Sequence, residues 1–552
     1  MIASTFSDSG VDPALLAQLS ASNGVPKAVF KSADFFVFFA RTIYPLLESL
    51  RPELDSLYEG DNGRPPIDPV RMLAVVILQF LERLPDRQAS QAMQYDTRWR
   101  LALHLHDGQC ACDPSLLSIF RRRLLAGEKE RLAFDAVLQL LVDEGWVPKR
   151  SKQRIDSTHV CGLLARMGRL ERARETIRLV LIAVERAGEL PECWAPMWET
   201  YVESKIDPRI SADKLKVKLL QGGEDMETIL AWALERGGDW EQAESIRVLK
   251  RVFAENYQTD ENGQRQTRRV QPAGAVHNPH EPEAQWSSKS TTKDKQWVGY
   301  KAQVAETVED EPRKRGEPTR SFITAVLTQE AIASDKAGMV EVLAQESSSG
   351  LEPPEVTYVD GAYVSAQVLK DHHEQGRELM GPAPASPDRG KVFTIEAFEV
   401  DVAERSAVCP AGEANTQCSR LEERKTGKVN YRFKWNGKLC GTCPQRDKCV
   451  SPSQPHRTLV VGQNHSFLQS RRKEMNAPSF KKEMYRRNAI EGTMSELVRA
   501  YGLRKARYRG LAKVRLQNHL IGIACNLNRL FRRISWENVT TQVFRSRFSM
   551  PC

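Results

Sequence analysis

The segment KQRIDSTHV (residues 152–160) decides the fold, because it is a short strand-like run with an acid, Asp156, at its centre. The segment EVTYVDGAYVS (355–365) has a similar form: an apolar run that ends at Asp360 and a glycine. The other elements predicted nearby are strands at 297–307 and 321–329 and helices near 335–347 and 366–376. Strands that alternate with helices across this part of the chain predict an α/β core.

Three acids in this pattern are candidates for metal chemistry. Asp156 and Asp360 lie in or at the end of predicted core strands, where a charge is costly unless it is paired or binds a metal. Glu491 follows Arg487 by four residues on a predicted helix, so both face the same side. If the fold gathers the acids, two Mg²⁺ or Mn²⁺ ions about 3.5–4 Å apart would relieve their repulsion and would suit phosphodiester chemistry. Each acid alone is explained as readily by a cap or a surface ion pair.

The charge of the chain is concentrated in one segment. The 552 residues carry 80 Lys and Arg and 71 Asp and Glu, a net +9. Residues 471–533 contain 17 Lys and Arg but 4 Asp and Glu, a net +13, so the remainder is −4. Such a block predicts a polyanion-binding surface better than a solvated helix face. Interleaved aromatic and apolar residues indicate that this surface is folded.

The other regions add a helical N-terminus and a cysteine cluster. Residues 35–146 show helical periodicity and contain short helices that end in a basic one, as in helix-turn-helix DNA binders, although small helical bundles also look like this. Eleven cysteines without a secretory signal argue against a disulfide framework. The spacing of Cys440, Cys443 and Cys449, with Cys409 or less directly Cys418 as a fourth ligand, suits structural Zn²⁺; an iron–sulfur cluster or free thiols are the alternatives.

Several classes are disfavoured. No apolar run approaches the ~20 residues that span a bilayer, so we expect a soluble, cytoplasmic protein without membrane contact. A phosphate-binding Gly-x4-Gly-Lys motif is absent, so ATP use is not indicated. His159 lies on the opposite strand face from Asp156, which favours a structural role over that of a general base.

The motifs, taken in order, resemble bacterial insertion-sequence DDE transposases with an RNase H-like core. RIDSTHV (154–160) and TYVDGAYVS (357–365) resemble the two Asp blocks, and residues 484–530 resemble the third block, with its Tyr-Arg-Glu signature and Asn-Leu-x-Arg-Leu end. Residues 87–124 are similar to the helical domain that precedes the core, and HNPHEPEAQWSSK with WVGYKAQV (277–304) to the second-strand region. The resemblance spans roughly residues 35–535.

The resemblance implies a DNA transposase. Asp156, Asp360 and Glu491 would be the catalytic, metal-binding triad, and Arg487 would contact phosphate. The implied partners are terminal inverted repeats and target DNA, and two ends call for a homodimer. Tyr485 is one residue closer to the arginine than in the usual signature, and Tyr363 one position later than the usual tyrosine. The residues expected to bind DNA are Tyr485, Arg486, Arg487, Arg504, Lys505, Arg507, Arg509, Lys513, Arg121, Arg122 and Arg123.

Two other functions stay open. One is an RNase H-like nuclease that cleaves without strand transfer, and the other is an inactive DNA-binding regulator derived from a transposase. The expected organisation is a loose N-terminus (1–34), a helical DNA-binding domain (35–148), an RNase H-like α/β catalytic domain with a mixed sheet (149–535) and a C-terminal tail (536–552). A mainly helical insertion (163–295) and a cysteine-containing insertion (385–470) interrupt the catalytic domain.

Overall fold

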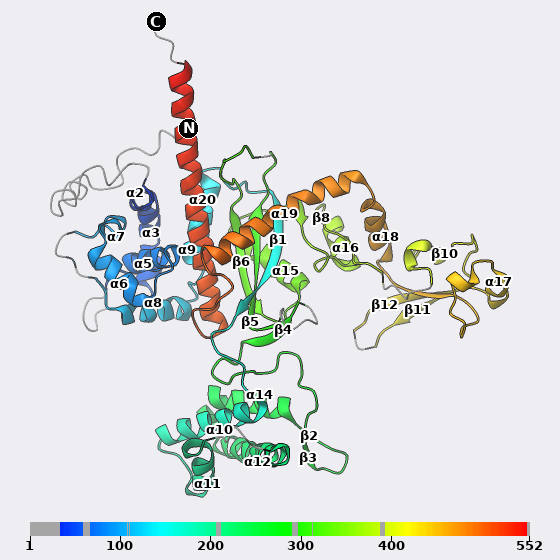
Figure 1. Ribbon diagram of the computed structural model, residues 1–552, viewed down its shortest axis with the longest axis horizontal. Coiled ribbons are helices and arrows are strands. Elements are labelled where there is room, and N and C mark those ends of the chain that lie inside the picture. The colour runs from blue at the N-terminus through cyan, green and yellow to red at the C-terminus, as the bar shows by residue number, and fades with distance from the viewer. Residues whose placement is uncertain are drawn as a thin grey trace.

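The computed structural model describes residues 34–58, 67–106, 109, 111–205, 211–289, 296–311, 313–386, 392–424 and 426–548 (Figure 1). Side chains of residues 539–548 are not described. The expected loose N-terminus at 1–34 therefore lies outside the described residues, apart from Asp34.

A mixed sheet forms the centre of the molecule. Its strands are β1 (Lys152–Cys161), β4 (Gln285–Ser288), β5 (Gln296–Thr307), β6 (Ile323–Glu330), β7 (Val356–Tyr358) and β8 (Glu378–Met380). β5 is antiparallel to β1 on one side and to β4 and β6 on the other. β7 is parallel to both β1 and β8. The expected α/β fold with a mixed sheet is confirmed.

Helices cover both faces of this sheet. Ile155 of β1 packs on one face with Met339 of α15 (Asp335–Ser348) and Leu369 of α16 (Ala366–Glu374). On the other face, Val304 of β5 joins a core formed with α19 (Pro478–Arg499) and α20 (Leu511–Phe548). Because side chains alternate along a strand, Asp156 lies on the face of β1 opposite to Ile155, towards α19.

The N-terminal helices share the core of the second face. They are α2 (Phe35–Phe38), η3 (Phe39–Ile43), α3 (Tyr44–Glu48), α4 (Arg51–Asp55), α5 (Pro69–Leu81), α6 (Asp86–Tyr95), α7 (Thr97–Ala102), α8 (Pro114–Ala126) and α9 (Leu132–Asp143). The side chains of Asp68 and Asp113 cap α5 and α8, each of which starts with a proline. α5 is apolar on all sides and is buried, with Phe80 packed in the same hydrophobic core as Phe134 and Leu520. The N-terminal helices are thus fixed to the sheet through α20.

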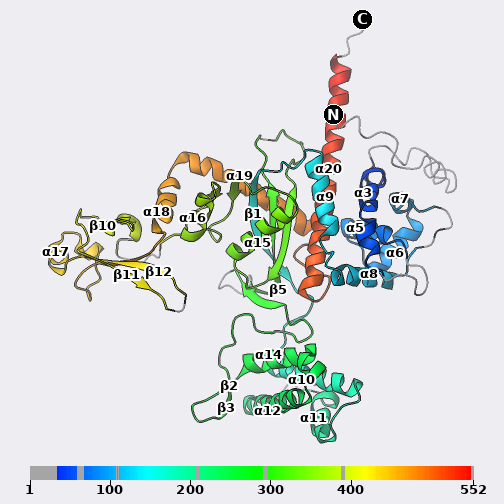
Figure 2. The ribbon, with the colours of Figure 1, turned by 180° about the vertical axis from the view of Figure 1, so that it is seen from behind.

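A separate helical bundle follows β1 and projects away from the sheet (Figures 1 and 2). It comprises α10 (Arg169–Arg186), η4 (Glu192–Trp194), α11 (Ala195–Trp198), η5 (Glu199–Glu203), α12 (Ala212–Arg236), α13 (Gly238–Gln242) and α14 (Glu244–Asn256), then a hairpin of β2 (Tyr257–Thr259) and β3 (Arg265–Thr267). The bundle has its own hydrophobic core.

Residues 257–295 are polar in composition, yet part of this stretch is buried. Its described part contains Val276 and Glu281, which are 0% and 1% exposed, and β4, which joins the central sheet. Glu281 accepts hydrogen bonds from the Tyr300 hydroxyl at 3.0 Å and from the Leu164 N–H at 3.1 Å. A polar composition is typical of exposed segments, but the hydrogen bonds of Glu281 lower the cost of its burial.

The cysteine-containing section extends from the sheet on the side away from the N-terminal helices (Figures 1 and 2). It contains η7 (Ile395–Ala397), β9 (Glu399–Asp401), β10 (Ser406–Val408), β11 (Gln417–Glu422), β12 (Val429–Lys434), α17 (Gly437–Thr442), η8 (Arg446–Lys448) and β13 (Thr458–Gly462), and α18 (His465–Glu474) leads back towards the sheet. Phe398, Phe433 and Trp435 are buried in a core of its own.

The C-terminal end differs from the expected tail. α20 continues past Trp536 to Phe548, so most of the segment 536–552 is helical where it is described. Within the described residues, no helix combines the length and the apolar character needed to cross a membrane.

Candidate functional site

Asp156 lies in the middle of β1, opposite Val304 of β5. Its Oδ1 accepts a hydrogen bond from the Ser157 N–H at 2.8 Å, and its Oδ2 lies 3.5 Å from Nη2 of Arg487 on α19. The side chain of Asp156 is 18% exposed, and that of Arg487 is 17% exposed. The first candidate acid is therefore accessible, but mostly removed from water.

Asp360 lies just beyond the end of β7, at the level of Asp156. The parallel register pairs Lys152 with Val356 and Arg154 with Tyr358, and its continuation brings Asp360 alongside Asp156. The Asp360 Oδ1 accepts a hydrogen bond from the Ala362 N–H at 2.8 Å, which fixes the turn after the strand. The two aspartates predicted from separate segments are thus neighbours.

The environment of Asp156 disfavours its negative charge. Burial raises the pKa of this carboxyl most strongly, and the charge of Asp360 adds to that effect. The Ser157 N–H, Arg487 and Lys289 lower the pKa, but they do not cancel the rise. Two neighbouring carboxylates whose negative charge is not fully compensated suit a hard divalent cation.

Tyr363 lies behind the two aspartates. It is fully buried, and its hydroxyl lacks a hydrogen-bond partner of good geometry, although Ser157 lies beside it. Burial, with the charges of Asp335, Asp156 and Asp360, raises the pKa of Tyr363 well above its usual value. The hydroxyl therefore stays protonated.

Glu491 is exposed on α19, one helical turn after Arg487. The neighbouring residues Ile490 and Thr493 are buried, so this face of α19 packs against the sheet. In the described part of the chain, no three His, Cys, Asp or Glu side chains are grouped closely enough to bind a metal ion. The fold thus brings together Asp156, Asp360 and Arg487, whereas Glu491 is exposed one turn further along α19 and is not part of this group.

Apart from Arg487, described above, the residues expected to bind DNA fall into two groups. The first group is exposed to solvent. It consists of Tyr485, which is 73% exposed, and of Arg504, Lys505, Arg509, Lys513, Arg122 and Arg123. Four of them lie on or beside the segment between α19 and α20, which is bonded to the end of β1: the Cys161 N–H donates to the Arg504 carbonyl at 2.8 Å, and the Ala506 N–H to the Cys161 carbonyl at 2.9 Å. A cationic surface therefore continues from the strand that carries Asp156.

The second group is engaged inside the protein. Arg121 is 6% exposed, pairs with Asp86 at 2.5 Å and lies 4.9 Å from the centre of the Tyr508 ring. Arg507 is half-buried and donates to the Leu84 carbonyl. Arg486 donates to the Glu309 carbonyl at 3.0 Å. The expectation that Arg121 contacts DNA does not fit its burial, because this side chain joins the N-terminal helices to the C-terminal segment.

The net charge of 471–533 overstates the positive surface. Arg471, Arg529 and Arg533 are 8%, 3% and 6% exposed. Arg529 and Arg533 pair with Glu306 at 2.8 Å and Glu317 at 2.6 Å, acids from a different part of the chain. The charge count along the sequence predicted a surface position for these arginines. In the fold they are buried, and Arg529 and Arg533 are paired with acids.

Comparisons with known families agree with this arrangement. Residues 408–531 match a family described as "Transposase DDE domain", and residues 27–123 match one described as "Transposase domain (DUF772)". These two matches support an insertion-sequence DDE transposase. No curated protein matches the chain. The first match includes Arg487 and Glu491, whereas Asp156 and Asp360 lie outside both matches.

The cysteines of the cysteine-containing section form a loose group. Cys449 is 8% exposed, and Cys409 and Cys440 pack against the same core. Burial raises the pKa of the Cys449 thiol, Arg457 opposes the rise, and the nearby thiols of Cys409, Cys440 and Cys443 add to it. Cys418 packs against the same core. The four predicted thiols are thus neighbours, although among the described residues no three are placed as metal ligands.

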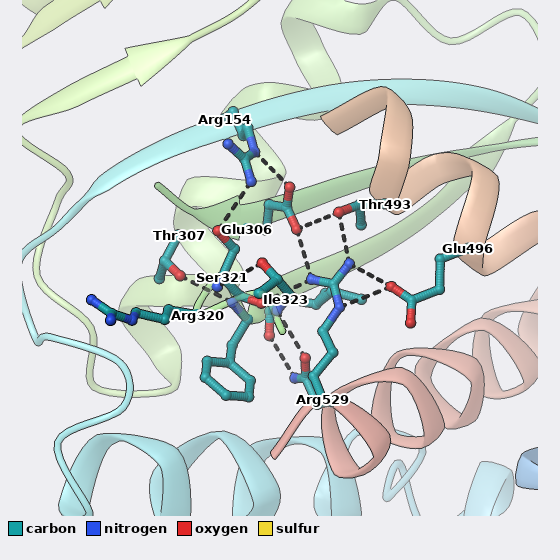
Figure 3. A network of polar contacts seen from close by, with 12 residues as sticks. Arg154, Glu306, Thr307, Arg320, Ser321, Ile323, Thr493, Glu496 and Arg529 are labelled. Atoms are coloured by element: carbon teal, nitrogen blue, oxygen red, sulfur yellow. Dashed lines mark hydrogen bonds and ion pairs between the residues drawn. The ribbon is translucent and has the colours of Figure 1, made fainter. Parts of the chain in front are cut away.

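The sequence did not reveal a buried polar cluster beside the candidate site. It includes Glu306 at the end of β5, which is fully buried, with Arg154 on β1 and Arg529 on α20 (Figure 3). The available signal was an acid near the end of a predicted strand, in the segment AQVAET (302–307). The Asn-Leu-x-Arg-Leu end of the third block also contributes, because its arginine is Arg529.

Proposed function

We propose that this transposase cuts DNA at the ends of an insertion sequence and joins the freed 3′-hydroxyl to target DNA. The observation that carries the proposal is the juxtaposition of Asp156 and Asp360 on adjacent parallel strands with Arg487 beside them. The strand arrangement, with β6, β5 and β1 antiparallel and β7 and β8 parallel to β1, supports an RNase H-like catalytic core.

Asp156, Asp360 and Glu491 would hold the divalent ions, Mg²⁺ or Mn²⁺. Bound there, the ions would activate water or a 3′-hydroxyl and stabilise the leaving oxygen. The raised pKa of Asp156 and its neighbour Asp360 support this role, because a cation would relieve both burial and repulsion. Since Glu491 is exposed, it would complete the ligand set by a movement of its side chain.

Arg487 would position the scissile phosphate. Its Nε is buried without a hydrogen-bond partner, and its ion pair with Asp156, at 3.5 Å, is longer than a tight one. A phosphate oxygen between them would satisfy the free N–H. The exposed Arg504, Lys505, Arg509 and Lys513 would bind the DNA that leaves the site, and two protein copies would pair the two ends.

The four neighbouring thiols would form a structural Zn²⁺ site in the cysteine-containing section. Thiolate repulsion at Cys449 supports this, because a cation would remove it. The ligands would have to move closer than they now lie. Elemental analysis of purified protein should find about one zinc per chain, and Cys443→Ser should lower it; full metal loading of the variant would contradict the assignment.

The experiment that tests the transposase reaction compares Asp156→Asn, Asp360→Asn and Glu491→Gln with wild-type protein on DNA that carries the element's ends. Each variant should lose Mg²⁺-dependent cleavage by at least roughly 100-fold while it still binds DNA, because only the metal ligands are removed. Asp143→Asn, which changes an exposed acid on α9, serves as the matched control. Retained cleavage in all three variants would exclude the assignment.

The products distinguish the remaining alternatives. Joined DNA is expected from a transposase, whereas released ends without joining would indicate a nuclease. DNA binding without any cleavage by wild-type protein would indicate a regulator derived from a transposase.

A further inference from the structure

A cluster of buried charges lies between the sheet and the two C-terminal helices (Figure 3). Glu306 of β5 is at its centre and is fully buried. Its Oε1 accepts a hydrogen bond from the Arg154 Nε at 2.5 Å, and its Oε2 accepts one from the Arg529 Nη1 at 2.8 Å. We call this group the Glu306 cluster; it consists of Arg154, Glu306, Ser321, Thr493, Glu496 and Arg529.

The cluster contacts the buried face of α19 at two positions along the helix. The Thr493 hydroxyl donates to Glu306 Oε2 at 2.7 Å and accepts from the Arg529 Nη2, also at 2.7 Å. Arg529 also pairs with Glu496 at 2.8 Å, one turn further along the helix. On the other side, Arg154 Nη1 donates to the Arg486 carbonyl at 3.0 Å. β1, β5, α19 and α20 are therefore joined through one polar group.

These contacts bracket the candidate catalytic residues. Arg486 precedes Arg487, and Thr493 follows Glu491 by two positions. Arg154 precedes Asp156 by two positions, so both side chains lie on the same face of β1. The contacts of the cluster thus fix the rotation of α19 about its axis and its position along β1. They do so close to the residues that have to face Asp156.

We propose that the Glu306 cluster is a positioning device that fixes α19 against β1 so that Arg487 and Glu491 face Asp156. The inference rests on the proposed function, because it assigns Glu491 to the metal site. It concerns residues that do not touch DNA or metal themselves.

Charge and geometry favour this role over simple stabilisation. Two arginines face two glutamates, so the cluster is close to neutral. Burial would raise the pKa of Glu306, but the charges of Arg529 and Arg154 outweigh it and lower that pKa, so the carboxylate stays ionised. A buried ion pair often stabilises no more than apolar packing would, but its directional bonds specify one arrangement of the elements. Apolar contacts alone would let a helix slide or rotate.

The test uses Thr493→Val, which removes one hydroxyl and leaves every charge paired. Hydrogen exchange should become faster in the amides of α19. The Mn²⁺ concentration that gives half-maximal cleavage should rise roughly tenfold, as when groups behind metal ligands are changed, with DNA affinity unchanged within twofold. Thr493→Ser keeps the hydroxyl and should restore both properties.

Thr324→Val is the matched control, because Thr324 is also buried and donates to a buried acid, Glu346, at 2.5 Å on the opposite face of the sheet. It should lower the melting temperature without changing α19 exchange or the Mn²⁺ requirement. If Thr493→Val changed only the melting temperature, the cluster would be merely stabilising and the inference would fail. Cleavage by Asp156→Asn would instead reject the proposed function, while exchange in α19 would still report on the cluster.

Discussion

At the scale of single residues, the same chemical group has different consequences according to its burial. The carboxyl of Glu306 is fully buried but faces two arginines, and its pKa is lowered. The carboxyl of Glu346, on α15, is also fully buried, but its neighbour is the hydroxyl of Thr324. Burial raises the pKa of Glu346 to about 7, and the Thr324 hydroxyl and the more distant Arg131 offset this only in part. The two glutamates therefore have opposite effects on stability.

Glu346→Gln should change how stability depends on pH. Wild-type Glu346 is protonated in the folded protein up to about pH 7 but ionised in the unfolded chain above about pH 4.5, so its contribution to the free energy of unfolding falls as the pH rises between these values. At about 1.4 kcal/mol per pKa unit, the variant should gain up to about 3 kcal/mol over wild type between pH 5 and pH 8.

Urea denaturation at those two pH values would measure the difference for Glu346→Gln. The Gln153 amide lies beside Glu346 and, when its nitrogen faces the acid, is 2.9 Å from both oxygens, so it can bond either protonation state by rotating. A difference that stayed constant with pH would show that Glu346 is ionised throughout.

At the scale of elements, side chains of α20 form hydrogen bonds with β6, a strand at the edge of the sheet. The Asn526 side chain donates to the Ile323 carbonyl at 2.8 Å and accepts from the Ile323 N–H at 2.9 Å, as a neighbouring strand would. Asn518, two turns earlier, donates to the Thr328 hydroxyl at 2.9 Å. Between them, a Cβ on Gly522 would lie 2.9 Å from both Phe134 and Val326. α20 is therefore shaped to fit closely against β6.

Asn526→Leu should destabilise the protein by roughly 2–4 kcal/mol, because it leaves two buried backbone groups of Ile323 without partners. The midpoint of urea denaturation should fall while the slope stays unchanged. Asn538→Leu, at an exposed position of the same helix, should change stability by less than about 0.5 kcal/mol. Equal effects of the two substitutions would mean that the Asn526 bonds do not matter for folding.

At the scale of the whole molecule, α20 is the axis on which the other parts are assembled. N-terminal helices α5 and α9 pack on it from one side and β6 from the other, while the helical bundle and the cysteine-containing section project from the sheet separately (Figures 1 and 2). Many arginines of the C-terminal segment are used in this assembly. The DNA surface that we expect is consequently smaller than the charge count suggests, and it is centred on the segment between α19 and α20.

The triple variant Lys505→Gln, Arg509→Gln, Lys513→Gln should bind end DNA more weakly because it removes exposed cations near β1. The slope of log K against log salt should become shallower by about one for each phosphate that the variant no longer neutralises. Titrations at several salt concentrations would measure it. Neutralising Lys214, Lys216 and Lys218, three exposed lysines of α12, should leave the slope unchanged. A similar weakening in both variants would argue for diffuse, non-localised binding.

Much of the core was predictable because its signals are local. The alternation around Asp156, the apolar run before Asp360 and the helical spacing of Arg487 with Glu491 each lie within a dozen residues. The structure confirms the strands and places the two aspartates side by side. By contrast, the burial of Glu281 and Arg121 was not predictable. Their partners, Tyr300 and Asp86, are distant from them in the chain, and the sequence does not distinguish these partners from other polar residues.

The sequence by itself determined the α/β class, the order of the motifs and the resemblance to DDE transposases, since periodicity and motif order do not depend on long-range contacts. Only the tertiary structure decided which charges face water. Arg529 and Lys513 belong to the same basic block, yet Arg529 is 3% exposed and paired with Glu306, whereas Lys513 is exposed. The partner of a buried charge is chosen by how sheets and helices pack across more than two hundred residues, and no local pattern records that choice.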